Sequence, residues 1–243
     1  MTQPDLVVQV TNPNSTGSMT DLIGRSARAV AGPGVSVVAV GSPDGPACIE
    51  TAVDEVHAAP GVLRMVADGE LRGVDGHVIA CFGDPGLDAA RLVARGPVVG
   101  IAEAAMRSAT FLGRRFSVVT TAATAVPGIE DLAFRYGVAG ACAGVHASGV
   151  GVLELGTDPA AYDRVLAAAR AAVAADRSDV VVLGCAGMAD WAARLGEDLG
   201  RPVVDGVAAA VGTVVALVRS GAPTTVGGRA VAGASPQPFG QPV

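Results

Sequence analysis

Two cysteines occupy matching places in two similar stretches of the sequence, 104 residues apart. Cys81 opens CFGDPGLDAARL and Cys185 opens CAGMADWAARL, and each ends an apolar run that predicts a buried strand. In a parallel α/β sheet, ligands bind at the carboxyl ends of the strands. One thiol on each wall of a cleft could remove a proton from a carbon atom while the other returns one to the opposite face, with no cofactor or metal. We therefore expect Cys81 and Cys185 to be catalytic.

Other roles for the two cysteines stay open at this point. A cysteine at the end of a buried strand is most often a small, inert core side chain, which is what we expect of Cys48 and Cys142. A disulfide between Cys81 and Cys185 is a second alternative. Proton transfer is most efficient when the pKa of the transferring group lies near the working pH, and thiol pKa values normally lie above neutrality. We expect a helix N-terminus after each cysteine to lower that pKa and to supply N–H donors for an enolate.

Polar residues follow two further predicted strands. Asn12 and Asn14 come after the first strand, and Thr120 and Thr121 end the equivalent strand of the second half. Their amides and hydroxyls could bind the polar edge of a ligand, or could simply cap helices and form turns. Asp84 precedes a proline and is expected to fix that turn rather than to act as a base.

The order of the predicted elements indicates an α/β fold. Short β-branched runs alternate with longer helical patterns, and repeated βα units form parallel sheets with right-handed crossovers. The likeness of the two halves predicts two pseudo-symmetric domains, each a parallel sheet flanked by helices, with the active site in the cleft between them. Strands are expected at 5–10, 35–40, 77–81, 97–101, 115–121, 139–145, 179–185 and 202–204. Helices are expected between them, including one that starts near Cys48 and others at 125–136, 159–175, 190–199 and 205–220.

The two predicted domains divide the chain unevenly. The first is expected to comprise residues 1–98 plus 205–243, with the last helix returning to it, and the second to comprise 99–204. The chain would then cross between them near residues 98 and 205, where we expect hinge motion on ligand binding. Residues from about 222 onward are rich in Gly, Pro and Ser and are expected to form a mobile tail.

The charged residues exclude several classes of function. The chain of 243 residues has a formal net charge of −6, so it lacks the basic patch that nucleic acid binding requires. All seventeen basic residues are arginines, and without lysine neither a Schiff base nor a P-loop can form. His57, His77 and His146 are not spaced like metal ligands. We expect them mostly at the surface or in loops, and we expect no metal site.

The apolar segments and the N-terminus indicate in which cellular compartment the protein is expected. No uninterrupted apolar run is long enough to span a membrane, so no membrane association is expected. The chain enters an apolar strand by residue 6 without a basic segment and a small-residue cleavage site. We expect a cytoplasmic protein whose four cysteines remain reduced thiols.

Seven short segments, in their order along the chain, resemble the Asp/Glu/hydantoin racemase superfamily, in particular its hydantoin and allantoin racemase branch. The segments are VTNPNST, GPACIE, CFGDPGLDAAR, GIAEAAM, FSVVTT, VPGIEDLAFRYG and LGCAGM. The resemblance covers about residues 5–220, and CFGDPG with a distant GCAGM is its most specific part. It implies two flavodoxin-like domains and a cofactor-independent racemase whose cysteine pair is Cys81 and Cys185. The same matching implies a ligand site formed by Asn12, Asn14, Phe82, Gly83, Thr120, Thr121, Ala186 and Gly187.

The expected reaction is inversion at C5 of a 5-substituted hydantoin, allantoin included, by proton transfer between the two cysteines. The resemblance implies that amino-acid racemases carry a histidine soon after the second cysteine, and CAGM has none. Decarboxylase relatives keep only one thiol, so the pair favours racemisation. The expected partner is a small-molecule substrate, and a homo-oligomer is expected from this branch. The alternatives are an amino-acid racemase, a related isomerase or decarboxylase, and a non-catalytic small-molecule binding protein.

Overall fold

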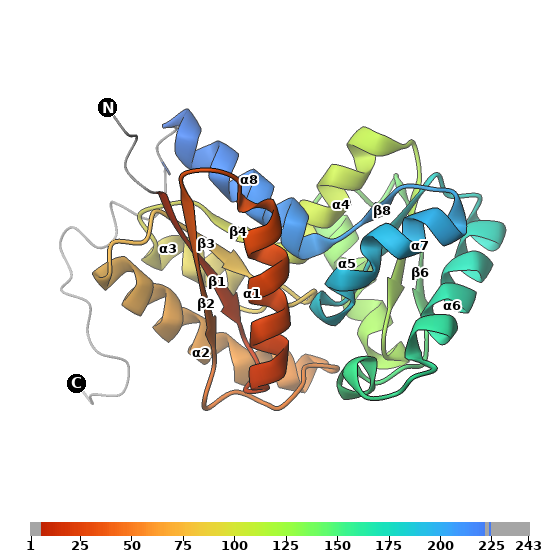
Figure 1. The fold of residues 1–243 in the computed structure, drawn as a ribbon, viewed down its shortest axis with the longest axis horizontal. Coiled ribbons are helices and arrows are strands. Elements are labelled where there is room, and N and C mark those ends of the chain that lie inside the picture. Colours follow the sequence, from red (N-terminus) through yellow and green to blue (C-terminus); the bar gives the residue numbers. More distant parts are fainter. Residues whose placement is uncertain (1–5, 222–223, 225–243) are drawn as a thin grey trace.

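In the computed structural model, which describes residues 6–221 and 224, the chain forms two parallel four-stranded sheets (Figure 1). The first has the order β2-β1-β3-β4 and the second the order β6-β5-β7-β8, so both halves repeat one topology. The strands are β1 Leu6–Asn12, β2 Val35–Gly41, β3 Gly76–Ile79, β4 Val98–Gly100, β5 Phe116–Thr120, β6 Cys142–Ala147, β7 Val180–Leu183 and β8 Val203–Val204. The expected α/β fold is confirmed. The expected mobile tail from about residue 222 lies outside the described residues, except for Thr224.

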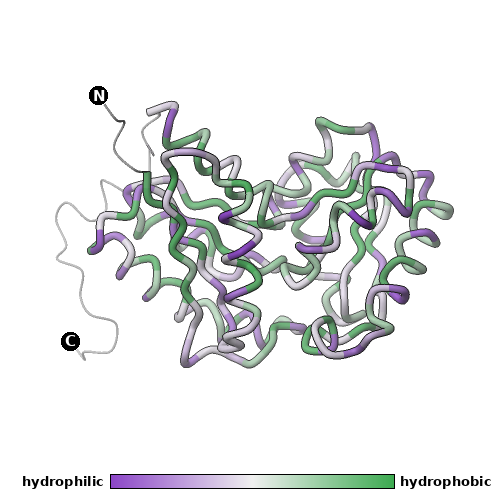
Figure 2. Tube along the Cα trace, in the orientation of Figure 1, coloured by the Kyte–Doolittle hydropathy of each residue, from purple (hydrophilic) through white to green (hydrophobic). Residues whose placement is uncertain are grey.

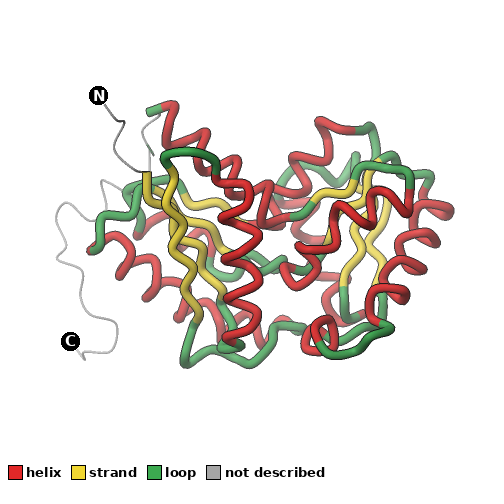
Figure 3. Tube along the Cα trace, in the orientation of Figure 1, coloured by secondary structure: helices red, strands yellow, loops and turns green. Residues whose placement is uncertain are grey.

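Helices flank both sheets (Figure 3). They are α1 Gly17–Ala31, α2 Ala52–Leu71, α3 Leu87–Val93, α4 Ile101–Leu112, α5 Val126–Arg135, α6 Ala161–Asp176, α7 Ala192–Leu199 and α8 Gly206–Ser220, with short 3-10 helices η1 Ala123–Ala125, η2 Val152–Gly156 and η3 Ala186–Trp191. Helix α8 returns to the first half, where it packs against α1 and β3, and it also contacts α4. Within the described residues, no helix has the length and hydropathy needed to cross a bilayer. The division into 1–98 plus 205–243 and 99–204 stays a prediction.

The strands that precede the two cysteines lie inside their sheets. Strand β3 lies between β1 and β4, and β7 lies between β5 and β8. Every residue of β3 and β7 is buried, as expected for strands that helices cover on both faces. Figure 2 shows the apolar strands inside each half and polar stretches on the outer helices. Cys81 and Cys185 each lie two residues beyond the end of such a strand.

An apolar contact between α4 and α8 joins the two halves. Ala102, Ala105 and Met106 of α4 and Val207 and Val211 of α8 are all fully buried. These residues belong to one core cluster that includes strands of both sheets. Because most of these side chains are small, the two helices can pack closely, and the sheets are held with their strand ends near one another.

The helix expected to start near Cys48 starts at Ala52 instead. Thr51 and Asp54 form a capping box: Asp54 N donates to Thr51 Oγ1 at 3.3 Å, and Thr51 N donates to Asp54 Oδ2 at 2.9 Å. This reciprocal pair sets the first turn of α2 four residues later than expected. Cys48 therefore lies in the loop of residues 42–51, which reaches from the first half toward the second (Figure 1).

The expectation that the histidines lie mostly at the surface or in loops is wrong for His77, and His146 lies half-buried in strand β6. His77 lies in β3 and is completely buried. Its Nε2 lies 3.0 Å from Glu70 Oε1, and Glu70 also pairs with Arg95. Burial lowers the pKa of His77 despite the nearby carboxylate, so the ring is neutral at pH 7 and serves as a core side chain.

Candidate active site

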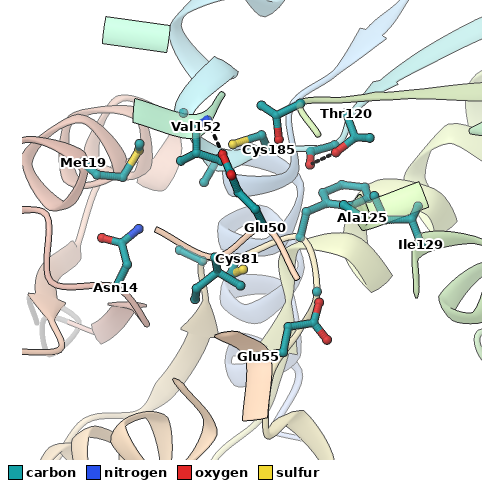
Figure 4. A pocket seen from close by; sticks show the side chains of 18 residues that line it. Asn14, Met19, Glu50, Glu55, Cys81, Thr120, Ala125, Ile129, Val152 and Cys185 are labelled. Atoms are coloured by element: carbon teal, nitrogen blue, oxygen red, sulfur yellow. Dashed lines mark hydrogen bonds between the residues drawn. The ribbon is translucent and has the colours of Figure 1, made fainter. Parts of the chain in front are cut away.

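A single pocket contains both cysteines (Figure 4). It has a volume of about 50 Å³ and lies where the carboxyl ends of strands from the two sheets meet. Its walls come from both halves of the chain, so neither half could form it alone. The lining residues are Asn14, Met19, Ile49, Glu50, Glu55, Ala80, Cys81, Phe82, Gly83, Thr120, Thr121, Ala125, Ile129, Val152, Gly184, Cys185, Ala186 and Gly187.

The backbone holds Cys81 and Cys185 in the same way. Ala80 N donates to Thr11 O and Gly184 N donates to Val119 O, each at 2.8 Å, so both strands are anchored one residue before the cysteine. The carbonyl of each cysteine then accepts a bond from the N–H three residues later, at 3.0 Å for Cys81 and 3.1 Å for Cys185. A tight turn therefore starts at each thiol, which is the structural basis of the sequence likeness.

The pocket makes both thiols harder to ionise than free cysteine. Burial raises the pKa of Cys81 strongly, and the charges of Glu55, Cys185 and Asp84 add to this effect. Burial also raises the pKa of Cys185 to about 11. The expectation of lowered pKa values is therefore wrong for this structure. Cys185 precedes only a short 3-10 helix and α3 begins six residues after Cys81, so loss of solvation outweighs any helix dipole.

One interaction at each thiol does favour the thiolate. The backbone N–H of Gly83 lowers the pKa of Cys81, and the backbone N–H of Gly187 lowers that of Cys185. In both cases the donor lies two residues after the cysteine. These two N–H groups are the features of the pocket that can stabilise negative charge on either sulfur once a proton has left.

The pocket brings together most residues that the sequence indicates as ligand-binding. The lining includes Asn14, Phe82, Gly83, Thr120, Thr121, Ala186 and Gly187 but not Asn12. Asn12 lies behind Asn14: its Nδ2 donates to Asn14 Oδ1 at 2.8 Å and to Thr20 Oγ1 at 2.9 Å. Thr120 uses its hydroxyl to bond Gly184 O at 3.1 Å, which ties the ends of β5 and β7 together.

The side-chain amide of Asn14 is oriented by its neighbours. Asn14 Oδ1 accepts two bonds, from Asn12 Nδ2 and from Thr16 N at 3.0 Å. These bonds determine which end of the amide is the oxygen, so Nδ2 is left as a donor directed toward the pocket (Figure 4). Asn12 therefore acts as a positioning residue in this arrangement, rather than as part of the wall.

Two acidic residues of the wall were missed by the sequence analysis. Glu50 lies near the end of the loop of residues 42–51, and its Oε1 accepts a bond from Val152 N of the second half at 2.7 Å. Thr124 of the second half also donates to Glu50 O, at 2.7 Å. Glu55 lies in the first turn of α2. A signal for Glu50 was available in GPACIE, one of the segments that carry the family resemblance, whereas Glu55 lies outside that segment.

Asp84 joins the Cys81 turn to the second half. The carboxylate accepts bonds from Ala102 N at 3.1 Å, from Glu103 N at 3.0 Å and from Tyr136 Oη at 2.6 Å. Burial raises the pKa of Asp84 to about 6, although these bonds oppose the shift. Asp84 therefore has a structural role as expected, but it caps α4 as well as contributing to its own turn.

Comparison with known proteins places this chain in a defined family. The family model described as Asp/Glu/hydantoin racemase matches residues 8–214, which is most of the chain. The chain therefore belongs to the Asp/Glu/hydantoin racemase family, and it is an enzyme of the racemase type.

Individual relatives with names and solved structures are also similar to this chain. The hydantoin racemase of Rhizobium meliloti is 46% identical over 219 residues, covering 90% of this chain and 91% of the relative. The solved structure of allantoin racemase from Klebsiella pneumoniae is 46% identical and superposes with a TM-score of 0.88, covering 90% of each chain. Allantoin racemase from Pseudomonas fluorescens is 37% identical with a TM-score of 0.85, covering 90% of this chain and 94% of that chain.

Proposed function

We propose that the protein racemises 5-substituted hydantoins, allantoin included, by exchanging the proton at C5. The observation that carries the proposal is the equivalent backbone setting of Cys81 and Cys185 in one pocket. The names of the similar relatives, hydantoin racemase and allantoin racemase, support the substrate class.

The proposed reaction needs one thiolate and one thiol on opposite faces of the substrate. The thiolate takes the C5 proton and becomes a thiol, while the electron pair of the broken C–H bond moves toward the adjacent carbonyl as an enolate. The other thiol then gives its proton to the opposite face of C5 and becomes the thiolate. Cys81 and Cys185 exchange these roles according to the enantiomer bound, so the enzyme can work in both directions.

The enolate oxygen requires a hydrogen-bond donor. The backbone N–H groups after the cysteines were expected to fill this role, but Gly83 N–H and Gly187 N–H favour the thiolates. We assign the role to the amide Nδ2 of Asn14, because its oxygen is already held by two bonds. The Thr121 hydroxyl lines the same pocket and is a second candidate donor.

Substrate entry requires the pocket walls to separate, because about 50 Å³ is well below the roughly 300–1,000 Å³ of typical small-molecule sites. The predicted hinges near residues 98 and 205 would permit this. Opening would break the bonds that Val152 N and Thr124 Oγ1 make to Glu50. Comparing small-angle scattering with and without ligand tests this motion.

A chiral panel of hydantoins followed by polarimetry tests the proposed activity. Pure enantiomers of allantoin and of 5-alkylhydantoins should lose optical rotation, and the product formed in deuterium oxide should carry deuterium at C5. Cys81→Ser or Cys185→Ser with full turnover would contradict the mechanism. The predicted cytoplasmic location and homo-oligomeric state remain separate predictions, to be tested by fractionation and by light scattering.

A further inference from the structure

The two carboxylates in the pocket wall have different surroundings. Glu50 is held by Val152 N, as described above. Glu55 lines the pocket, and its carboxylate has no hydrogen-bond or ion-pair partner among residues 6–221 and 224. Glu55 is half-buried, and this burial raises the pKa of its carboxylate, with the nearby charge of Asp54 adding to the effect. A carboxylate in this state is an unused acceptor of hydrogen bonds.

The carboxylate of Glu55 lies against the turn that follows Cys81. A Cβ atom added at Gly83 would overlap Glu55 Oε1, so the absence of a side chain at Gly83 is what leaves room for this carboxylate. The charge of Glu55 is also among the causes that raise the pKa of Cys81. A substrate presenting a carbon to Cys81 would therefore place its other groups within reach of Glu55.

The described part of the pocket wall contains no cationic side chain. Glu50 and Glu55 are its charged residues, and neither arginine nor histidine lines it. A substrate carboxylate would meet two negative charges and no counter-ion. An amide, imide or ureido group would instead offer N–H donors to a carboxylate, and such charge-assisted bonds are among the stronger hydrogen bonds.

We propose that Glu55 is a specificity-determining residue, which accepts a hydrogen bond from an N–H of a neutral substrate and excludes substrates that carry a carboxylate. This inference rests on the proposed hydantoin racemisation and deepens it. A hydantoin carries N–H groups on its ring, and a ureido or carboxamide substituent at C5 adds more. A carboxylate substituent offers no donor at neutral pH and is repelled.

Two substrates that differ in charge and little in shape test the proposal. These are 5-(carbamoylmethyl)hydantoin, which is neutral, and 5-(carboxymethyl)hydantoin, which is anionic. For the wild type, kcat/KM should be at least about tenfold higher for the neutral compound. In Glu55→Gln, KM for the neutral compound should rise about tenfold while the anionic compound is turned over as well or better. The preference should therefore shrink about tenfold or more.

Two control variants separate charge from shape. Glu197→Gln makes the same chemical change at an exposed position of α7, away from the pocket, and should keep the wild-type preference. Glu55→Asp keeps the charge on a shorter side chain and should still reject the anionic compound. An equal fall for both substrates in Glu55→Gln, or an unchanged preference, would overturn the proposal.

Calorimetric binding of the same two compounds distinguishes failure of this inference from failure of the proposed function. If both compounds are racemised and the preference does not depend on Glu55, the inference about Glu55 is contradicted and the proposed function stands. Glu55-dependent binding of the neutral compound without racemisation contradicts the proposed function and supports the role of Glu55 in recognition. Binding of neither compound contradicts both.

Discussion

Replacing Asp84 by alanine should lower the free energy of unfolding by about 3 kcal/mol at pH 7, because three buried donors lose their acceptor. The donors are Ala102 N, Glu103 N and Tyr136 Oη. Asp84 is only 4% exposed and Tyr136 only 7%, so water cannot readily take the place of the carboxylate. Each orphaned donor costs about 1 kcal/mol or more, and the cap of α4 is lost as well.

The pKa of Asp84 gives this prediction a pH dependence with a definite sign. Burial raises the pKa of the folded state to about 6 from 3.8, so the folded protein binds the proton more tightly than the unfolded chain. The stability that Asp84 adds is therefore fully present below about pH 4 and falls as the pH rises through about 6. The loss in Asp84→Ala should be about 1 kcal/mol larger at pH 5 than at pH 7.

Urea unfolding monitored by the single tryptophan, Trp191, measures both effects. Asp88→Ala is the matched control, since Asp88 is 64% exposed and pairs with Arg135 and Arg91 at the surface. The control should change stability by less than about 1 kcal/mol. An Asp84→Ala variant that loses no more than the control, or loses more at pH 7 than at pH 5, would refute the reasoning.

Three further predictions address the pocket and its support. Asn12→Ala and Asn12→Asp should both lower kcat/KM about tenfold, because Asn14 loses the donor that orients its amide. Both variants should also unfold at a lower temperature, because Asn12 is buried and bonds both Asn14 and Thr20, so the kinetics are measured well below that transition. Unchanged kinetics would remove Asn12 from its positioning role. The alkylation of Cys185 by iodoacetamide can be followed by peptide mass spectrometry. Its rate should rise about tenfold per pH unit between pH 7 and 9, because the pKa of Cys185 is raised to about 11. A rate that is already maximal at pH 7 would contradict a raised pKa. Gly184→Ala should lower the free energy of unfolding in urea by about 1–3 kcal/mol, because the added Cβ would lie 2.9 Å from Thr120 Cβ and 3.0 Å from Val118 Cγ1. A variant with wild-type stability would show that the ends of β5 and β7 can move apart without loss.

Much of the fold could be predicted from short-range patterns. Apolar runs of three to seven residues marked all eight strands, and the alternation with helical segments required parallel sheets. The likeness around Cys81 and Cys185 was informative because both turns use the same hydrogen bonds. Boundaries were less predictable where a cap decides them, as at Thr51 of α2.

The rest of the pocket depends on contacts that no local pattern contains. Glu50 lies in the loop before α2 and Glu55 in the first turn of α2, so most of α2 and strand β3 separate both from Cys81, and their place in the wall follows from how the loop and the helix pack. Thr124 and Val152 bond Glu50 across the two halves. The raised thiol pKa values likewise reflect burial between the halves rather than the neighbours of each cysteine in sequence.

Proton exchange at C5, measured separately for each enantiomer by NMR in deuterium oxide, tests the central claim most directly. The wild type should exchange both enantiomers with inversion. Cys81→Ser should exchange only the enantiomer whose C5 proton faces Cys185, without inversion, and Cys185→Ser should exchange only the other. Exchange of both enantiomers by either variant, or continued racemisation when both cysteines are replaced, would contradict the account.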